Sequence, residues 1–171
     1  NLFSGAVVNF KHQPSKQPEI QKAIIIYESL LKKIAHKINL AGSPYGFVSM
    51  GSTIICTIKA YIAVGGMPPK KATEDFYFLQ QLAKHNTIHF IKKVLVYPSA
   101  RGEQRVYLGT GYRMKNIKSK NVFNDLYINP YAYVVLKEFY SLIERNWENT
   151  PKEIISKVFI KDSKLGNCLE N

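Results

Sequence analysis

Apolar residues return along this chain with two different periods. Residues 5–12 form a short, mainly apolar run that predicts a β-strand, and Pro14 follows it. From residue 20 to residue 38 the apolar positions fall every three or four residues, which predicts an amphipathic helix that opens near Pro18. Gly42 fits a C-terminal cap. The first part of the chain is therefore expected to be a strand followed by a long helix.

The middle of the chain alternates short elements with turns. Phe47–Cys56 contains β-branched residues in short runs around Gly51 and predicts strand, whereas Thr57–Val64 predicts a short helix. Two glycines and two prolines at 65–69 mark a turn. Residues 73–75, Thr-Glu-Asp, form a polar cap ahead of an apolar stripe, which predicts another helix.

The remaining elements are predicted from shorter patterns. Two strands are expected at Ile88–Phe90 and Val94–Tyr97, followed by a loop at Pro98–Gly111 and a polar linker at Lys115–Asn121. One helix is expected at Asn129–Trp147 and another from the capping box at Thr150–Glu153, and a frayed tail begins at Lys161. Strand signals end before the linker. We therefore predict an α/β fold with a mixed sheet and flanking helices over residues 1–114, followed by a helical extension over residues 115–171.

Charge and cysteine content narrow the class of protein. The 171 residues carry a formal net charge of +12, so the surface is expected to attract phosphates, anionic lipid or nucleic acid, or simply to be a solvated basic surface. The two cysteines predict no disulfide framework and favour a reducing compartment. Tyr45–Met67 is apolar, but Lys59 and several glycines interrupt it, so we do not predict a membrane span there.

The most informative pattern runs from the paired glycines to the acidic helix start. Gly65-Gly66-Met67, then Thr73-Glu74-Asp75, then Phe-Tyr-Phe-Leu-Gln-Gln-Leu resembles a stretch of family 2, GT-A-type glycosyltransferases. The resemblance implies that Asp75, with Glu74 beside it, is the catalytic base that deprotonates the acceptor hydroxyl. A sugar hydroxyl is a poor nucleophile until a base removes its proton. The alternative is that both carboxylates only stabilise the helix start, where each contributes about 0.3 to 1 kcal/mol.

The same resemblance extends to residues on both sides of this motif. It implies that the small residues Gly51 and Ser52, together with Gly65 and Gly66, border the acceptor side of the cleft. It also implies that a later loop binds substrate: the guanidinium groups of Arg101 and Arg105 would bind the donor diphosphate, and Gln104 is a further substrate-binding residue. Surface solubility is the alternative for the arginines, and relief of a β-bulge is the alternative for Gly51.

The pattern of the loop indicates which kind of transferase is expected. Gln104 and Arg105 are similar to the Gln-x-x-Arg-Trp motif of processive synthases, but no Trp follows, so a single transfer is expected. His12, at the end of the first predicted strand, is a further candidate for the cleft, while the other histidines are scattered and form no nucleophile motif.

The resemblance covers residues 1–114 and corresponds to the acceptor-side half of a GT-A domain. No Asp-x-Asp occurs in the sequence, so the nucleotide-binding half and its divalent metal, Mg or Mn, are expected upstream. No cofactor is therefore expected in this chain, and the chain alone should be inactive. The implied reaction is sugar transfer, with inversion, from a nucleotide-sugar donor to a saccharide or lipid-linked acceptor. The expected setting is bacterial cell-envelope polysaccharide or glycolipid synthesis in the cytoplasm, at the inner face of the membrane, with peripheral contact to anionic lipid.

A second hypothesis comes from a different class. The chain is basic and contains 11 Tyr and 9 Phe, so a non-catalytic module that binds nucleic acid or an anionic membrane surface would use the same features. Most of these aromatic residues fall at helical core spacing, and no RNP, KH or zinc-finger signature is present. We therefore expect no nucleic-acid partner.

Overall fold

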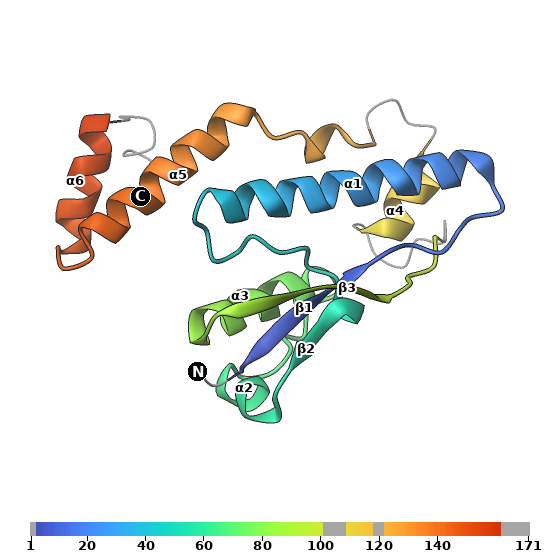
Figure 1. Ribbon diagram of the computed structural model, residues 1–171, viewed down its shortest axis with the longest axis horizontal. Helices are drawn as coiled ribbons and strands as arrows, with labels where there is room; N and C mark the ends of the chain where they lie inside the picture. Colours follow the sequence, from blue (N-terminus) through green and yellow to red (C-terminus); the bar gives the residue numbers. More distant parts are fainter. Residues whose placement is uncertain (1–2, 101–108, 118–121, 162–171) are drawn as a thin grey trace.

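A three-stranded sheet forms the centre of the protein. The computed structural model describes residues 3–100, 109–117 and 122–161. Strand β1 (Gly5–Phe10) lies between β2 (Ile54–Cys56) and β3 (Ile88–Val96), antiparallel to β2 and parallel to β3 (Figure 1). The predicted α/β class, with a mixed sheet and flanking helices, is confirmed at this level.

Strand β1 is buried on both faces, as expected for a central strand whose sequence is a continuous apolar run. One face packs through Val7 against helix α2 (Ile58–Ala63) and helix α3 (Glu74–His85). The cluster on that face comprises Val7, Ala60, Phe78, Leu79 and Leu82. On the other face the Phe10 ring lies 4.8 Å from Nζ of Lys32, a residue of helix α1 (Pro18–Leu40). The sheet is therefore covered by short helices on one side and by one long helix on the other.

Helix α1 confirms the prediction made from the apolar period. It begins at Pro18 and ends at Leu40, and the residue after its cap, Gly42, has a φ of +85°. Its buried residues Ala23, Ile24 and Tyr27 pack against Met114 of a short helix, α4 (Thr110–Lys115). Helix α4 was not predicted, because a six-residue helix is too short to show a period in a segment of loop-like composition.

Strand β3 is one element where two strands were predicted. Lys92 and Lys93 interrupt its apolar pattern, but both side chains are exposed because β3 is at the edge of the described sheet. The pairing with β1 shifts register on either side of Asn9, and the Asn9 side chain donates a hydrogen bond of 3.0 Å to the Lys92 carbonyl. The irregularity is therefore absorbed within a continuous strand.

The predicted strand at Phe47–Cys56 is mostly wrong. Residues 47–50 have no regular structure, Gly51–Thr53 form the 3-10 turn η1, and only Ile54–Cys56 pair with β1. The Thr53 hydroxyl and amide both donate to the Met50 carbonyl at 2.8 Å, which closes the turn. Side-chain bonds of this kind compete with strand pairing.

The C-terminal part is helical, as predicted. A 3-10 turn, η2 (Asn124–Leu126), precedes α5 (Pro130–Arg145) and α6 (Pro151–Lys161), which lie together away from the sheet (Figure 1). The capping box is confirmed, since the Thr150 amide and hydroxyl donate to Glu153 at 2.8 and 2.9 Å. The extension contacts the rest of the protein near the end of α1, where the Ser43 hydroxyl bonds to that of Tyr140 at 3.1 Å. The boundary at residue 114 stays a prediction.

Across residues 3–100, 109–117 and 122–161, every helix is either too short or too polar to cross a membrane.

Candidate active site

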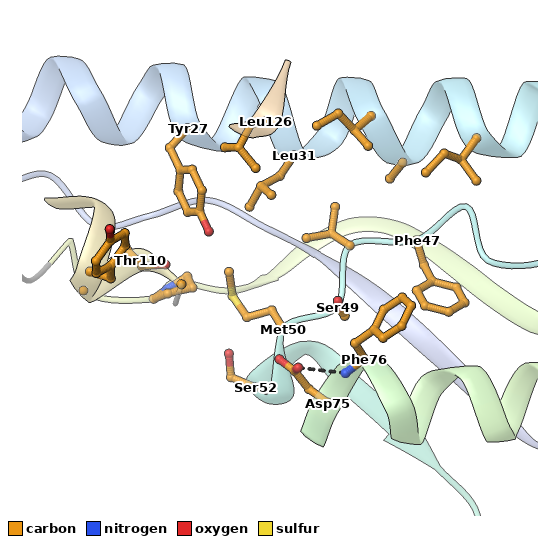
Figure 2. Close-up of a pocket in the computed structure, with 18 of the residues that line it drawn as sticks. Tyr27, Leu31, Phe47, Ser49, Met50, Ser52, Asp75, Phe76, Thr110 and Leu126 are labelled. Atoms are coloured by element: carbon orange, nitrogen blue, oxygen red, sulfur yellow. Dashed lines mark hydrogen bonds between the residues drawn. The ribbon is translucent and has the colours of Figure 1, made fainter. Parts of the chain in front are cut away.

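An open cleft of about 760 Å³ lies between α1 and the start of α3, within the range of small-molecule sites in proteins (Figure 2). One wall is the lower face of α1, and the other is built from residues 45–52 and the first turn of α3. The residues that line it are Tyr27, Leu31, Ile34, Ala35, Ile38, Tyr45, Phe47, Val48, Ser49, Met50, Ser52, Asp75, Phe76, Pro98, Ser99, Gly109, Thr110, Gly111, Tyr112, Leu126 and Ile128.

Asp75 is the one carboxylate among the described residues that line this cleft. It is the second residue of α3, and its Oδ1 accepts a hydrogen bond of 2.7 Å from the Phe76 amide (Figure 2). Burial raises the pKa of Asp75 above its usual value of 3.8, and the charge of Glu74 adds to this. Hydrogen bonds from the backbone at Phe76 and Gly51 act in the opposite direction but do not cancel the rise. The carboxylate is thus made more basic than a free aspartate.

The backbone just before Asp75 is strained. Thr73 has a φ of +66°, and it is the one described residue other than glycine with positive φ. Such a conformation costs a β-branched residue about 1 to 3 kcal/mol and is concentrated at functional sites. Thr73 occupies the predicted capping position, but its hydroxyl donates to the Ala72 carbonyl, so no side-chain cap forms. Asp75 itself satisfies one of the free amides of the first turn.

Gly51 and Ser52 lie near Asp75 in the described structure. Ser52 lines the cleft, and a Cβ added at Gly51 would lie 4.0 Å from the Cβ of Asp75. The alternative explanation for Gly51, a β-bulge, is wrong, because Gly51 opens the turn η1 and is not part of a strand. The structure therefore brings the Gly51-Ser52 pair and Asp75 together across 22 intervening residues of sequence.

Gly65 and Gly66 are not at the cleft. They end helix α2 with φ values of +78° and +75°, and their amides donate to the Ile62 and Tyr61 carbonyls. A Cβ on Gly66 would lie 3.0 Å from the Tyr61 ring. Their described role is to terminate α2, since left-handed backbone and this close approach both favour glycine.

The other predicted residues have different outcomes. Glu74 is half-buried, is not among the described residues that line the cleft, and helps to raise the pKa of Asp75 through its charge. Arg101, Gln104 and Arg105 lie outside the described residues, so their role stays a prediction. The chain on both sides of that segment, at Ser99 and at Gly109, does line the cleft.

His12, a candidate for the cleft, is not among the described residues that line it. It is 7% exposed, and its Nδ1 lies 3.1 Å from Oε2 of Glu28 on α1, while no described residue bonds to its Nε2. Strand β1 carries it underneath α1 and away from Asp75. Its contact with Glu28 joins the end of β1 to the helix.

Sequence reasoning missed the apolar wall of the cleft. Leu31, Ile34 and Ile38 were interpreted only as the buried stripe of a helix, yet each is half-exposed and lines the cleft. The sequence held no signal for this, because an apolar period marks one face of a helix without showing what covers that face.

The described part of the chain contains no group of three or more His, Cys, Asp or Glu side chains that could hold a metal ion. Comparison with protein-family models, with curated proteins and with solved structures finds no match to this chain.

Proposed function

We propose that this chain carries the acceptor side of a glycosyltransferase in which Asp75 is the general base. The observation that supports this most is the position of Asp75, a carboxylate with a raised pKa that faces a cleft of ligand size. A general base works best when its pKa is moved toward the working pH. Two neighbouring features also support the proposal: the backbone at Thr73 is strained, and Gly51 lies close to Asp75.

The proposed reaction is a single displacement. The acceptor hydroxyl gives its proton to the Asp75 carboxylate while its oxygen forms a bond to the anomeric carbon of the donor sugar. The bond to the nucleoside diphosphate breaks, and the diphosphate leaves with the bonding electrons, so the anomeric configuration is inverted. Ser52 lines the same cleft and would hold the acceptor by a hydrogen bond.

Residues outside the described part complete the proposal. Arg101 and Arg105 would bind the donor diphosphate, because guanidinium groups bind phosphate oxygens in a forked geometry. The described chain on either side of them lines the same cleft as Asp75, which supports a common site for donor and acceptor.

The experiment is a turnover assay with a panel of nucleotide-sugars, in the longest natural form of the protein that contains this chain. Asp75→Asn should lower kcat by about 10²- to 10⁴-fold, the usual contribution of a general base, and leave donor affinity unchanged. Glu19→Gln, an exposed carboxylate in the first turn of α1, is the matched control and should retain full turnover. Normal turnover in Asp75→Asn would remove this residue from the mechanism.

We also propose that the protein binds its acceptor at a membrane surface. A second cavity, of about 550 Å³, lies next to the cleft and shares Ile34, Leu126 and Ile128 with it. Lys33 and Lys37 line this second cavity, and each lysine near an anionic surface adds about 1 kcal/mol of attraction. Flotation with phosphatidylglycerol liposomes tests it. Equal binding to neutral liposomes would contradict it, and tight salt-dependent binding to single-stranded DNA would favour the nucleic-acid hypothesis instead.

A further inference from the structure

The cleft carries a small polar group of side chains within a mainly apolar lining. Asp75, Ser49 and Ser52 lie on its floor, while Tyr27, Leu31 and Leu126 approach from the opposite side (Figure 2). The described lining includes no lysine, arginine or histidine. Each sugar hydroxyl that is removed from water must regain a hydrogen bond, and the α1 side chains from Leu31 to Ile38 that line the cleft offer no hydrogen-bonding group.

Among the described residues, part of the apolar stripe of α1 faces the cleft. The cluster around Met114 covers α1 at Ala23, Ile24 and Tyr27 and also contacts Leu31, whereas Ile34 and Ile38 continue the stripe along the cleft. Across the cleft Phe76 is 39% exposed, and Ile128, at its edge, is 37% exposed. Apolar surface on both sides of a water-filled cleft is stabilised by an apolar ligand.

The charge next to the cleft indicates where such a ligand would come from. The wall formed by Leu126 and Ile128 separates the cleft from the cavity that contains Lys33 and Lys37. A basic surface beside an apolar cleft suits a molecule with a hydrocarbon chain that is drawn from an anionic lipid layer.

We propose that the cleft binds an amphiphile. Its hydroxyl-bearing head group lies at Asp75 and Ser52, and its hydrocarbon chain lies between α1 and the side chains of Met50 and Phe76. This rests on the proposed function for the role of Asp75, and it names the acceptor class: a glycolipid or another hydroxylated lipid rather than a free sugar. The hydrocarbon chain holds the head group against the carboxylate.

The test uses n-alkyl β-D-glucosides below their micelle concentrations, with glucose as the head group alone, in calorimetric titrations of the 171-residue chain. Affinity should rise about fourfold for each added CH₂ and be undetectable for glucose. Met50→Gln and Ile128→Asn should each weaken octyl glucoside binding by roughly tenfold. Ile62→Asn is the control, since Ile62 is 70% exposed on α2 outside the cleft, and it should bind like the wild type.

Three results would overturn the proposal: affinity that does not depend on chain length, glucose binding as well as octyl glucoside, or an equal loss in Ile62→Asn. Sedimentation that shows a dimer broken by Ile128→Asn, without glucoside binding, would make the cleft a self-association surface instead. The Asp75→Asn variant distinguishes the amphiphile site from the proposed catalytic role of Asp75. If that variant turns over normally while the chain-length series holds, the amphiphile site stands and the catalytic role of Asp75 fails.

Discussion

Glu28 joins the end of β1 to helix α1 through several hydrogen bonds. Its Oε2 accepts the His12 amide at 2.9 Å and lies 3.1 Å from the His12 ring, and its Oε1 accepts from Lys32 at 2.7 Å. Lys32 donates a second hydrogen bond of 2.7 Å to the Phe10 carbonyl. Because the Glu28 side chain is only 17% exposed, we predict that Glu28→Gln destabilises the fold much more than a surface substitution does.

The expected loss follows from the bonds that the carboxylate makes. Glutamine keeps the shape of the glutamate side chain but removes its charge. Its amide NH₂ group would also face a hydrogen-bond donor instead of accepting from it. Breaking a fully buried ion pair costs about 3 to 5 kcal/mol, and a hydrogen bond to a charged group contributes about 1.5 to 3 kcal/mol. Lys32 is 36% exposed, so solvent screens the pair and the lower range applies. A loss of about 2 kcal/mol corresponds to a fall in Tm of roughly 4 to 8 °C.

The loss should depend on pH in a defined direction. Burial alone would raise the pKa of Glu28, but the hydrogen bonds from Lys32 and His12 outweigh it and hold the pKa below the usual 4.5. A lowered pKa means that the stabilisation is complete above 4.5 and disappears as the pH falls through the folded-state value. The difference between wild type and Glu28→Gln should therefore shrink in acid.

Urea unfolding followed by circular dichroism, from neutral pH to below 4.5, measures both effects. Glu19→Gln on the same helix is the control, because Glu19 is exposed and no hydrogen bond of its side chain contributes to this network. Equal midpoints for the two variants at neutral pH would refute the reasoning, and so would a Glu28→Gln difference that stays constant in acid.

Three further predictions test the core, a turn and the candidate base. Leu82→Ala should lower the free energy of unfolding in urea by about 2 to 5 kcal/mol, because Leu82 on α3 is fully buried in a cluster with Val7 of β1. Gly66→Ala should lower Tm more than Gly65→Ala, since both have positive φ but only Gly66 approaches another side chain, that of Tyr61. Asp75→Asn should raise Tm at neutral pH, and this gain should vanish as the pH falls through 3.8, because a raised pKa means that folding disfavours the ionised carboxylate.

Each of these three has a result that would contradict it. A loss below about 1 kcal/mol for Leu82→Ala would mean that the cluster closes around the smaller side chain and leaves no cavity. Equal losses in the two glycine variants would show that the Tyr61 contact is unimportant. A lower Tm for Asp75→Asn at neutral pH would show that its charge at the helix start outweighs the cost of its burial.

The longer helices could be predicted from the sequence because their signals are local. The period of α1, the Asn129-Pro130 start of α5 and the Thr150–Glu153 capping box depend on residues within a turn or two of each other. The buried run of β1 identified the central strand in the same way. These elements form where the sequence predicts them, and they account for the α/β class.

The shorter elements depend on neighbours that are distant in sequence. Strand β3 is continuous through two lysines because β1 pairs with it and Asn9 bridges the irregularity. The segment before β2 turns instead of extending because Thr53 closes η1 on Met50. Neither outcome is visible in local propensity, since each rests on a partner or a competing side-chain bond.

The sequence by itself determined which residues are candidates for chemistry: the acidic start of α3 and the small residues Gly51 and Ser52. Only the tertiary structure decided which of them meet. It placed Gly51 and Ser52 against Asp75, removed His12 to a contact under α1, and used Gly65 and Gly66 to end α2. It also turned the apolar stripe of α1 into a cleft wall. The physical reason is that periodicity defines the apolar face of a helix, whereas the elements packed against that face decide how much of it is covered.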